Sequence, residues 1–233
     1  MKYFTSDYHF GHPSIIEYCG RKFKNIDRMT DVYIRDANQR APTKNDTIYH
    51  IGDFSCWGSE KGVEGSKVKA NEYLKRFNAN VILIEGNHDS GNRVKALMKS
   101  CTMDIGKWKN VSLGHYPSNY KEAKGTFVPG TLRLCGHVHG YGAWKWCWDA
   151  KHQILNINVG IDHWRHIVSV SEVLDYADAI VCKLNREKSK FKRFFQKLMF
   201  GFNQVPDNQF SDGMPVISTY GDRMKTGLVS KHK

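Results

Sequence analysis

The sequence predicts an α/β fold in which two packed β-sheets are covered by helices on their outer sides. The first half of the chain alternates strand-like and helix-like segments, and the second half is richer in strands. The chain has 233 residues, of which 40% are hydrophobic, so it can bury one sizeable core and carry an appendage. We therefore expect a globular domain with an additional segment rather than a disordered protein.

Six segments have the pattern of β-strands, in which apolar residues alternate with polar ones or form a short continuous run. They span residues 2–6, 46–52, 80–86, 110–115, 131–136 and 154–160. The alternation in 46–52 indicates a strand with one buried face, whereas the apolar run in 80–86 is typical of a strand covered on both faces.

Helices are predicted between the strands of the first half. Asp27 is a candidate N-cap for a helix that ends before Pro42. The Gly-rich stretch 57–66 predicts a loop, and a helix with one apolar face is expected over 67–77. A further short helix is expected over 93–100.

The last helix of the core is predicted to begin at a capping box formed by Ser169 and Glu172 and to run to Leu184. The character of the sequence changes after this helix, because the chain becomes strongly basic. We therefore divide the chain into a domain over residues 1–184 and a basic extension over residues 185–233.

The extension is expected to form an amphipathic basic helix over about 188–202, followed by an irregular tail. Its apolar residues recur at helical spacing, and they are Phe191, Phe194, Phe195, Leu198, Met199 and Phe202. From Lys183 to the end, the chain has eleven Lys and Arg against four Asp and Glu. Contact with nucleic acid or a membrane surface, a contact between subunits, and ordinary packing on the domain remain open for this helix.

Charge and cysteine content narrow the partners and the location expected for the chain. The formal net charge of +12 favours anionic partners such as nucleic acid, nucleotides or acidic lipid surfaces. None of the six cysteines belongs to a CxxC pair, so we expect neither a zinc ribbon nor a disulfide scaffold, and a reducing cytoplasmic location fits best. Neither a membrane-spanning helix nor a signal peptide is expected.

Ligand-type side chains follow five successive strands, each where the strand ends. They are Asp7 with His9, Asp53, Asn87, His115, and His137 with His139. In sheet folds, ligands bind in the crevice beyond the strand ends, and Asp, His and Asn suit divalent metals. These seven groups are more than one ion needs, and they suit two ions about 3.5–4 Å apart that share a carboxylate. The set contains no thiolate, so a structural zinc site is not expected.

The same stretches form an ordered set of motifs, which are D-x-H, GD, GNHD, GH and GHxH. This set resembles the calcineurin-like metallophosphoesterases over about residues 1–182. The longer stretches FTSDYHFGH, YHIGDFS, ILIEGNHD, GHYP, GHVHG and NVGID resemble a small bacterial and phage subgroup of that family. The resemblance implies a four-layer αββα sandwich, in which two mixed β-sheets are flanked by helices and a binuclear metal centre lies on the loops at one edge.

The resemblance also implies a role for each ligand-type side chain. Asp7, His9 and His139 would hold a first metal ion, Asn87, His115 and His137 would hold a second, and Asp53 would bridge both. The implied cofactors are two divalent transition metal ions. Manganese is favoured, and iron, zinc, nickel and cobalt remain open.

Further residues are candidates for catalysis or substrate binding. His88 matches the substrate-facing histidine of the family and could protonate the leaving oxygen. Asp89 would orient His88 or keep it charged, or it would be an ordinary turn carboxylate. His12 would contact substrate phosphate, hydrogen-bond a ligand, or do neither, and Arg21 and Arg93 would either face substrate phosphate or be solvated.

The activity implied is that of a metal-dependent phosphoric ester hydrolase, in which a metal-bridging hydroxide attacks the phosphorus. The stretch GDFSCWG lacks the GDxxDRG pattern of the Ser/Thr protein phosphatases, and GNHD stands where they have GNHE. We therefore expect a phosphodiesterase that acts on a nucleotide or nucleic acid. A phosphomonoesterase, and a non-catalytic nucleic-acid-binding or partner-binding module on the same scaffold, are the alternatives.

Three tryptophans directly after the last metal motif offer one more candidate contact. Trp144, Trp146 and Trp148 alternate, so they would share one face of a strand. They would form either a stacking wall for a base near the metals or the packed face of a hairpin. The sequence leaves both interpretations open.

Overall fold

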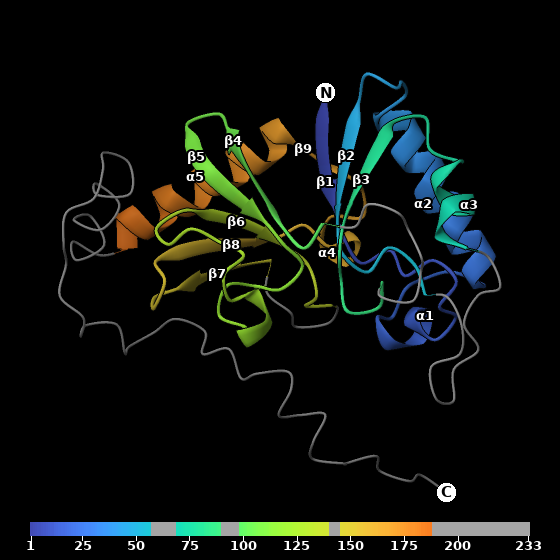
Figure 1. The fold of residues 1–233 in the computed structure, drawn as a ribbon, viewed down its shortest axis with the longest axis horizontal. Helices are drawn as coiled ribbons and strands as arrows, with labels where there is room; N and C mark the ends of the chain where they lie inside the picture. Colours follow the sequence, from blue (N-terminus) through green and yellow to red (C-terminus); the bar gives the residue numbers. More distant parts are fainter. Residues whose placement is uncertain (57–68, 90–97, 140–144, 188–233) are drawn as a thin grey trace, which may run out of the picture. The chain divides into compact units, whose positions relative to one another are not determined.

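A computed structural model describes residues 1–56, 69–89, 98–139 and 145–187 of the protein. It contains two mixed β-sheets with helices alongside them (Figure 1), which confirms the predicted α/β fold. The predicted loop at 57–66 and the helix at 188–202 lie outside the described residues.

The first sheet carries the N-terminal strands in the order β3-β2-β1-β9. Strands β1 (Lys2–Thr5), β2 (Thr47–Ile51) and β3 (Asn80–Ile84) are parallel, and the two-residue strand β9 (Val168–Ser169) is antiparallel to β1. Because the first three strands run in the same direction, their carboxyl ends meet at one edge of the sheet.

The second sheet has the order β4-β5-β6-β8-β7. Strands β4 (Cys101–Ile105) and β5 (Trp108–Leu113) form an antiparallel hairpin. Strand β5 is parallel to β6 (Leu132–Cys135), which is parallel to β8 (Ile154–Asn158). Strand β7 (Trp146–Asp149) runs antiparallel to β8. Strands β4 and β9 were not predicted. Strand β4 (CTMDI) does alternate apolar and polar residues and was overlooked, whereas β9 has only two residues and gives no recognisable pattern.

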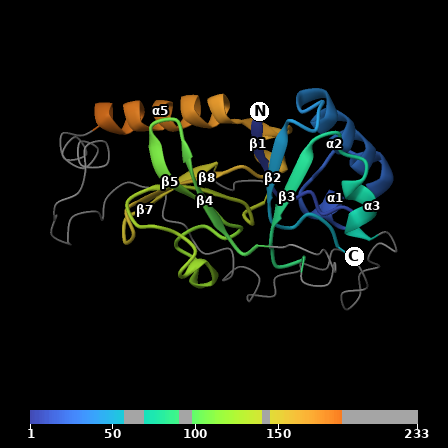
Figure 2. The same ribbon diagram turned by 45° about the horizontal axis from the view of Figure 1, so that its top comes forward.

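Five α-helices connect and flank the sheets. They are α1 (Ile15–Tyr18), α2 (Ile26–Arg40), α3 (Ala70–Leu74), α4 (Ile161–Trp164) and α5 (Val170–Glu187) within the described part of the chain. Helices α2 and α3 lie beside the first sheet, and α5 runs beside the second sheet in both views (Figures 1 and 2). An ion pair of 2.7 Å between Lys107 and Asp178 joins the β4–β5 turn to α5.

The N-terminal caps of two helices can be compared with the caps predicted from the sequence. The N-cap of α2 is Asn25, whose side-chain oxygen accepts a hydrogen bond of 2.9 Å from the N–H of Arg28, so the prediction of Asp27 as the cap was wrong. Asp27 instead lies in the first turn, where its charge suits the positive end of the helix dipole. The predicted capping box is confirmed, because the Ser169 hydroxyl and N–H both donate to the Glu172 carboxylate at 2.7 and 2.8 Å.

Several predicted boundaries shift. Helix α3 covers only Ala70–Leu74 of the predicted 67–77, and Met98 pairs with Ile84 in a β-bridge where the end of the 93–100 helix was expected. Helix α5 continues through the expected domain boundary at residue 184 to Glu187. The extension beyond it stays a prediction.

The core beneath the N-terminal loops is aromatic. The rings of Tyr8 and Phe10 lie 4.9 Å apart, and Phe54 meets Phe10 edge-on at 5.2 Å. All three are at most 1% exposed. These residues alternate with ligand-type residues at 7–10 and 53–54, so these two loops direct aromatic rings into the core and polar groups toward the opposite side.

The remaining expectations concern cysteines and membrane spans. All six cysteines are free thiols in the structure. Among the helices that the structure describes, none combines the length and apolar character needed to cross a bilayer.

One buried side chain should lower stability. His50 on β2 is fully buried against Tyr8 and Phe54, and neither of its ring nitrogens has a hydrogen-bond partner among the described residues. Burial lowers the pKa of His50 from 6.5 to about 3. Between those values the unfolded chain binds a proton that the folded chain does not, so His50 reduces stability as the pH falls from 6.5 toward 3.

We predict that His50→Leu raises the free energy of unfolding by about 1–2 kcal/mol at pH 7, because the unpaired polar atoms are removed. The gain should grow at pH 5. Urea denaturation of the metal-free protein at both pH values measures it. A less stable variant at pH 7, or an equal gain at both pH values, would contradict this account of His50.

Candidate metal centre

The seven ligand-type side chains all lie on loops that follow strands. Asp7 and His9 follow β1, Asp53 follows β2, Asn87 follows β3, His115 follows β5, and His137 and His139 follow β6. The structure brings them together in two groups that share one carboxylate.

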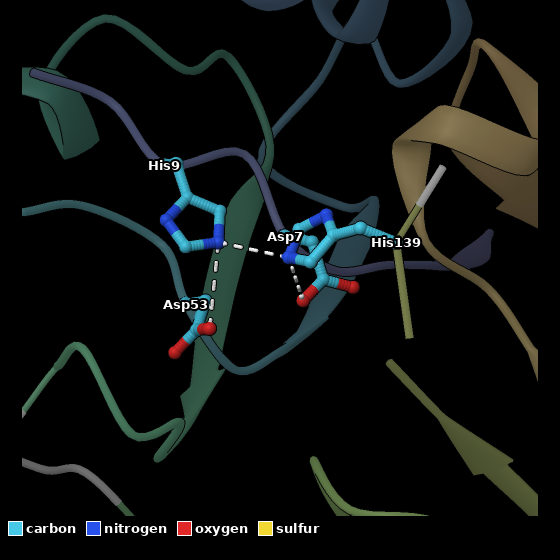
Figure 3. Close-up of side chains that lie close together, drawn as sticks. All are labelled: Asp7, His9, Asp53 and His139. Carbon is cyan, nitrogen blue, oxygen red and sulfur yellow. Dashed lines mark hydrogen bonds and ion pairs between the residues drawn. The ribbon is translucent and has the colours of Figure 1, made fainter. Parts of the chain in front are cut away.

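The first group contains four residues, of which Figure 3 shows the side chains. His9 Nε2 lies 3.1 Å from His139 Nε2 and 3.4 Å from Asp53 Oδ2. His139 Nε2 lies 3.6 Å from Asp7 Oδ1. One ligand atom from each of the four lies within 4.8 Å of the others, so a single ion can reach all of them.

The second group is built around His115 and His137. His115 Nε2 and His137 Nδ1 lie 3.0 and 3.1 Å from the same atom, Asn87 Oδ1. His115 Nε2 also lies 3.3 Å from Asp53 Oδ2. The same oxygen of Asp53 therefore faces His9 of the first group and His115 of the second.

The backbone is strained where it presents these ligands. Asp7, His9, Asp53 and His137 have φ angles of 63°, 54°, 56° and 70°, in the left-handed region that side chains other than glycine rarely adopt. Such residues cost of order 1–3 kcal/mol each and persist only when their surroundings hold them. Backbone hydrogen bonds of 3.0 Å from the N–H groups of Asp7 and His9 to the carbonyls of Gly52 and Asp53 provide that support.

Glycines allow the loops to approach this closely. A Cβ atom on Gly52, which has a φ of 87°, would collide with the ring of His115. A Cβ on Gly136 would collide with the side chains of Ser6 and Asp7. The glycines in the GD and GHxH motifs are therefore required for the ligand loops to meet.

The outer nitrogen of three ligand histidines is held by a neighbour. His115 Nδ1 donates to the Ile51 carbonyl at 3.0 Å, and His139 Nδ1 lies 2.9 Å from Asp162 Oδ2. His9 Nδ1 lies 3.4 Å from His12 Nδ1. With a proton on each outer nitrogen, the Nε2 lone pair of each ring faces the centre, as in established metal sites.

The structure also shows where His12 and Arg21 lie, two residues whose contacts the sequence left open. His12 is buried behind His9, so the structure places it among the outer contacts of a ligand. Arg21 is also buried and forms a bidentate pair with Asp162 at 2.7 and 2.8 Å, while it donates to the carbonyls of Tyr8 and Asp7. Its guanidinium is fully engaged and does not face substrate. Arg93 lies outside the described residues.

Asp162 was missed by the sequence reasoning, although the quoted NVGID stretch contains it. Its carboxylate forms an ion pair with Arg21 and lies within hydrogen-bonding distance of His139. The contacts span 141 and 23 residues of sequence, so no local spacing signals them.

Asp89 fastens two of the loops. Its fully buried carboxylate accepts hydrogen bonds of 2.8–2.9 Å from the N–H groups of Asp53, Phe54 and Gly86. Burial, together with the charge of Asp53, raises its pKa to about 6. The geometry makes Asp89 a positioning residue for the Asp53 loop.

His88 lies at the margin of the first group. Its N–H donates to Asp53 Oδ1 at 2.9 Å, and its half-buried ring lies 5.0 Å from the ring of His9. It is therefore beside the candidate ligands without belonging to either group.

Burial and the Asp53 carboxylate have opposite effects on the ligand histidines. Burial lowers the pKa of His9 well below its usual value and that of His137 to about 4, which leaves neutral rings able to coordinate metal. Burial would also lower the pKa of His115, but the Asp53 carboxylate raises it to about 9. The carboxylates thus attract cations, and the donor types fit divalent metal ions.

Comparison with known proteins identifies the family to which the chain belongs. Residues 3–175 match the family model described as calcineurin-like phosphoesterase. The chain belongs to the calcineurin-like phosphoesterase family. Membership of this family supports the activity of a metal-dependent phosphoester hydrolase. It implies divalent metal ions, which the clustered Asp and His side chains could bind, and a phosphoester substrate.

The chain is similar to two curated proteins. "Uncharacterized protein MJ1445" of Methanocaldococcus jannaschii is 36% identical over 87 residues, which are 37% of this chain and 46% of the relative, so less than half of the archaeal protein is matched. "Gene 66 protein" of Mycobacterium phage D29 is 24% identical over 200 residues, covering 76% of this chain and 96% of the relative.

Two solved structures resemble the fold. The protein of unknown function AQ665 from Aquifex aeolicus has a TM-score of 0.53 and 23% identity, and covers 76% of this chain and 98% of its own. Yfce, a phosphoesterase from E. coli, has a TM-score of 0.38 and 14% identity, and covers 67% of this chain and 77% of its own.

We predict that Asp162→Asn weakens metal binding about 10–100-fold, because His139 loses the carboxylate that orients it. Calorimetric titration of the metal-free protein with Mn²⁺ measures the affinity, and circular dichroism checks the fold. Asp175→Asn, on the exposed surface of α5, is the matched control. Equal affinities for both folded variants would contradict the role given to Asp162.

Proposed function

We propose that the chain is a binuclear-metal-dependent phosphodiesterase that acts on a nucleotide or nucleic acid. The observation that carries this proposal is the position of Asp53 Oδ2, which lies 3.4 Å from His9 Nε2 and 3.3 Å from His115 Nε2. A carboxylate shared by two donor groups is the arrangement expected of a bridging ligand in two-metal phosphoesterases.

In this proposal each group holds one ion. Asp7, His9 and His139 bind the first, Asn87, His115 and His137 bind the second, and Asp53 binds both. Such ions, when bound, would supply Lewis-acid chemistry: they would lower the pKa of a bound water and offset the charge of phosphoryl oxygens. Manganese is the ion we favour.

His88 and Asp89 have different tasks in the reaction. The half-buried ring of His88 stands beside the first group, where its imidazolium can protonate the leaving oxygen. Its backbone is fixed by the hydrogen bond from its N–H to Asp53 Oδ1. Asp89 acts through the backbone N–H groups it accepts from, and so keeps Asp53 in place.

Charge supports the choice of an anionic, nucleotide-type substrate. The net charge of +12 attracts polyanions and raises their encounter rate at low salt. We further propose that the protein works in the cytoplasm, which the six free cysteines support.

We predict that Asp53→Asn and His115→Ala lower the bound metal below two ions per chain. Turnover of bis(p-nitrophenyl) phosphate should fall by at least about 100-fold, because charge stabilisation at the phosphoryl group is lost. Metal analysis and parallel assays with the mono- and diester, with and without Mn²⁺, measure both effects. His166→Gln, at a half-buried histidine paired with Glu172, is the control.

Each alternative has its own outcome in that experiment. Faster turnover of the monoester would identify a phosphomonoesterase. Metal binding without hydrolysis of either ester would favour a non-catalytic module. Undiminished turnover by metal-free protein would overturn the proposal altogether.

We predict that His88→Ala slows cleavage of diesters with alcohol leaving groups by about 10²–10⁴-fold, and cleavage of p-nitrophenyl diesters much less. An alcohol leaves as a strong base and needs a proton, whereas p-nitrophenolate does not. Rates for a series of leaving groups test this, and equal losses across the series would refute a general-acid role.

A further inference from the structure

Two tyrosines stand beside the second group of ligands. The ring centroids of Tyr116 and Tyr120 lie 4.7 and 5.2 Å from that of His137, and Tyr116 also lies 5.1 Å from the ring of His115. The two tyrosine rings are nearly parallel, at an interplanar angle of 28° and a distance of 6.2 Å. They form a continuous aromatic surface next to the candidate metal centre, which we call the tyrosine wall.

The segment that carries the wall is fixed by buried polar contacts. Arg133, which is 1% exposed, donates to the Tyr116 carbonyl at 2.8 Å. The Ser118 N–H donates to Asn156 Oδ1 at 2.9 Å, and its hydroxyl donates to Asp149 Oδ2 at 2.6 Å. A loop held in this way presents its side chains in one geometry, so a ligand need not order the loop when it binds.

The wall is neutral and reachable from solvent. Both tyrosines are half-buried, so part of each remains in contact with water. Tyrosine phenols are uncharged near pH 7. Neither hydroxyl hydrogen-bonds to another residue in the described part of the chain. The surface therefore offers aromatic faces and two available hydroxyls, and no charge.

We propose that the tyrosine wall binds the nucleobase of the substrate, so that Tyr116 and Tyr120 set a preference for nucleoside phosphodiesters. This inference rests on the proposed phosphodiesterase function. Aromatic side chains stack on bases of any sequence, and the wall's place beside His137 puts a base next to a phosphate held at the centre.

Other aromatic residues suit this task less. Tyr18 is 68% exposed, but its ring meets only His12, 6.2 Å away, among the described rings. His12 is itself buried behind His9. Trp146 and Trp148 belong to the edge strand β7 of the second sheet, and Trp144 lies outside the described residues.

The test compares two diesters that share a leaving group, thymidine 5′-(p-nitrophenyl) phosphate and methyl p-nitrophenyl phosphate. We expect the wild-type protein to favour the nucleoside ester in kcat/KM by about tenfold or more. Tyr120→Leu should remove about tenfold of that preference through KM, and Tyr120→Phe should retain it because the ring remains. Tyr18→Leu, another tyrosine substitution, should leave the preference unchanged.

Binding provides a readout that does not depend on turnover. In calorimetric titrations of the Mn²⁺-loaded protein, thymidine 5′-phosphate should bind about tenfold more tightly than methyl phosphate, and Tyr120→Leu should abolish the difference. Titration with tetrathymidylate in the same experiment shows whether the base belongs to a nucleic acid or to a free nucleotide. Tighter binding of the strand indicates nucleic acid, equal binding indicates a free nucleotide, and both support base recognition.

The failures are distinguishable. Hydrolysis of both esters without preference, or a Tyr120→Leu loss that is equal for both, overturns the tyrosine wall but leaves the phosphodiesterase function intact. Loss of the preference for the nucleoside ester in Tyr18→Leu would place the base site near Tyr18 and would contradict base binding by the tyrosine wall. Absence of hydrolysis of either ester by the metal-loaded wild type defeats the proposed function itself.

Discussion

The shared carboxylate of Asp53 is the contact on which the site depends. Its Oδ2 faces His9 on one side and His115 on the other, while Oδ1 accepts the N–H of His88. Loops that follow five different strands must therefore arrive within a few ångströms of one residue. Asp89 makes this possible, because one buried carboxylate ties the Asp53 and Gly86 loops together through their backbone N–H groups.

The architecture explains how such a convergence is stable. Parallel strands bring their carboxyl ends to one edge, and an aromatic core that includes Tyr8, Phe10 and Phe54 anchors the loops from beneath. Four ligand-bearing residues adopt left-handed backbone geometry, among them Asp7 and Asp53. The surrounding packing offsets the cost of those conformations, and strain that concentrates at ligands is typical of a functional site.

The sequence predicted the two sheets and the seven ligand-type residues, because each residue sits in a local motif at a strand end. Of the residues behind them, it offered His12 as one of three alternatives and did not predict Asp162. Asp162 reaches His139 across 23 residues and Arg21 across 141, so only the folded chain brings them together. For the same reason the sequence left Arg21 open between a contact with substrate phosphate and a solvated position, whereas the folded chain buries it against Asp162.

The composition of the ligand set follows from the charge of what it must bind. Only Asp7 and Asp53 are acidic, and the other five side chains are amide or imidazole groups, which coordinate metal in their neutral forms. In the proposed two-ion centre, two divalent cations would leave a net positive charge in such a set, whereas four carboxylates would cancel it. The nearby acid Asp162 does not alter this balance, because Arg21 pairs with it at 2.7 Å. With both ions bound, a phosphoester anion would therefore meet a positive centre, and charge that develops on its oxygens would be stabilised there.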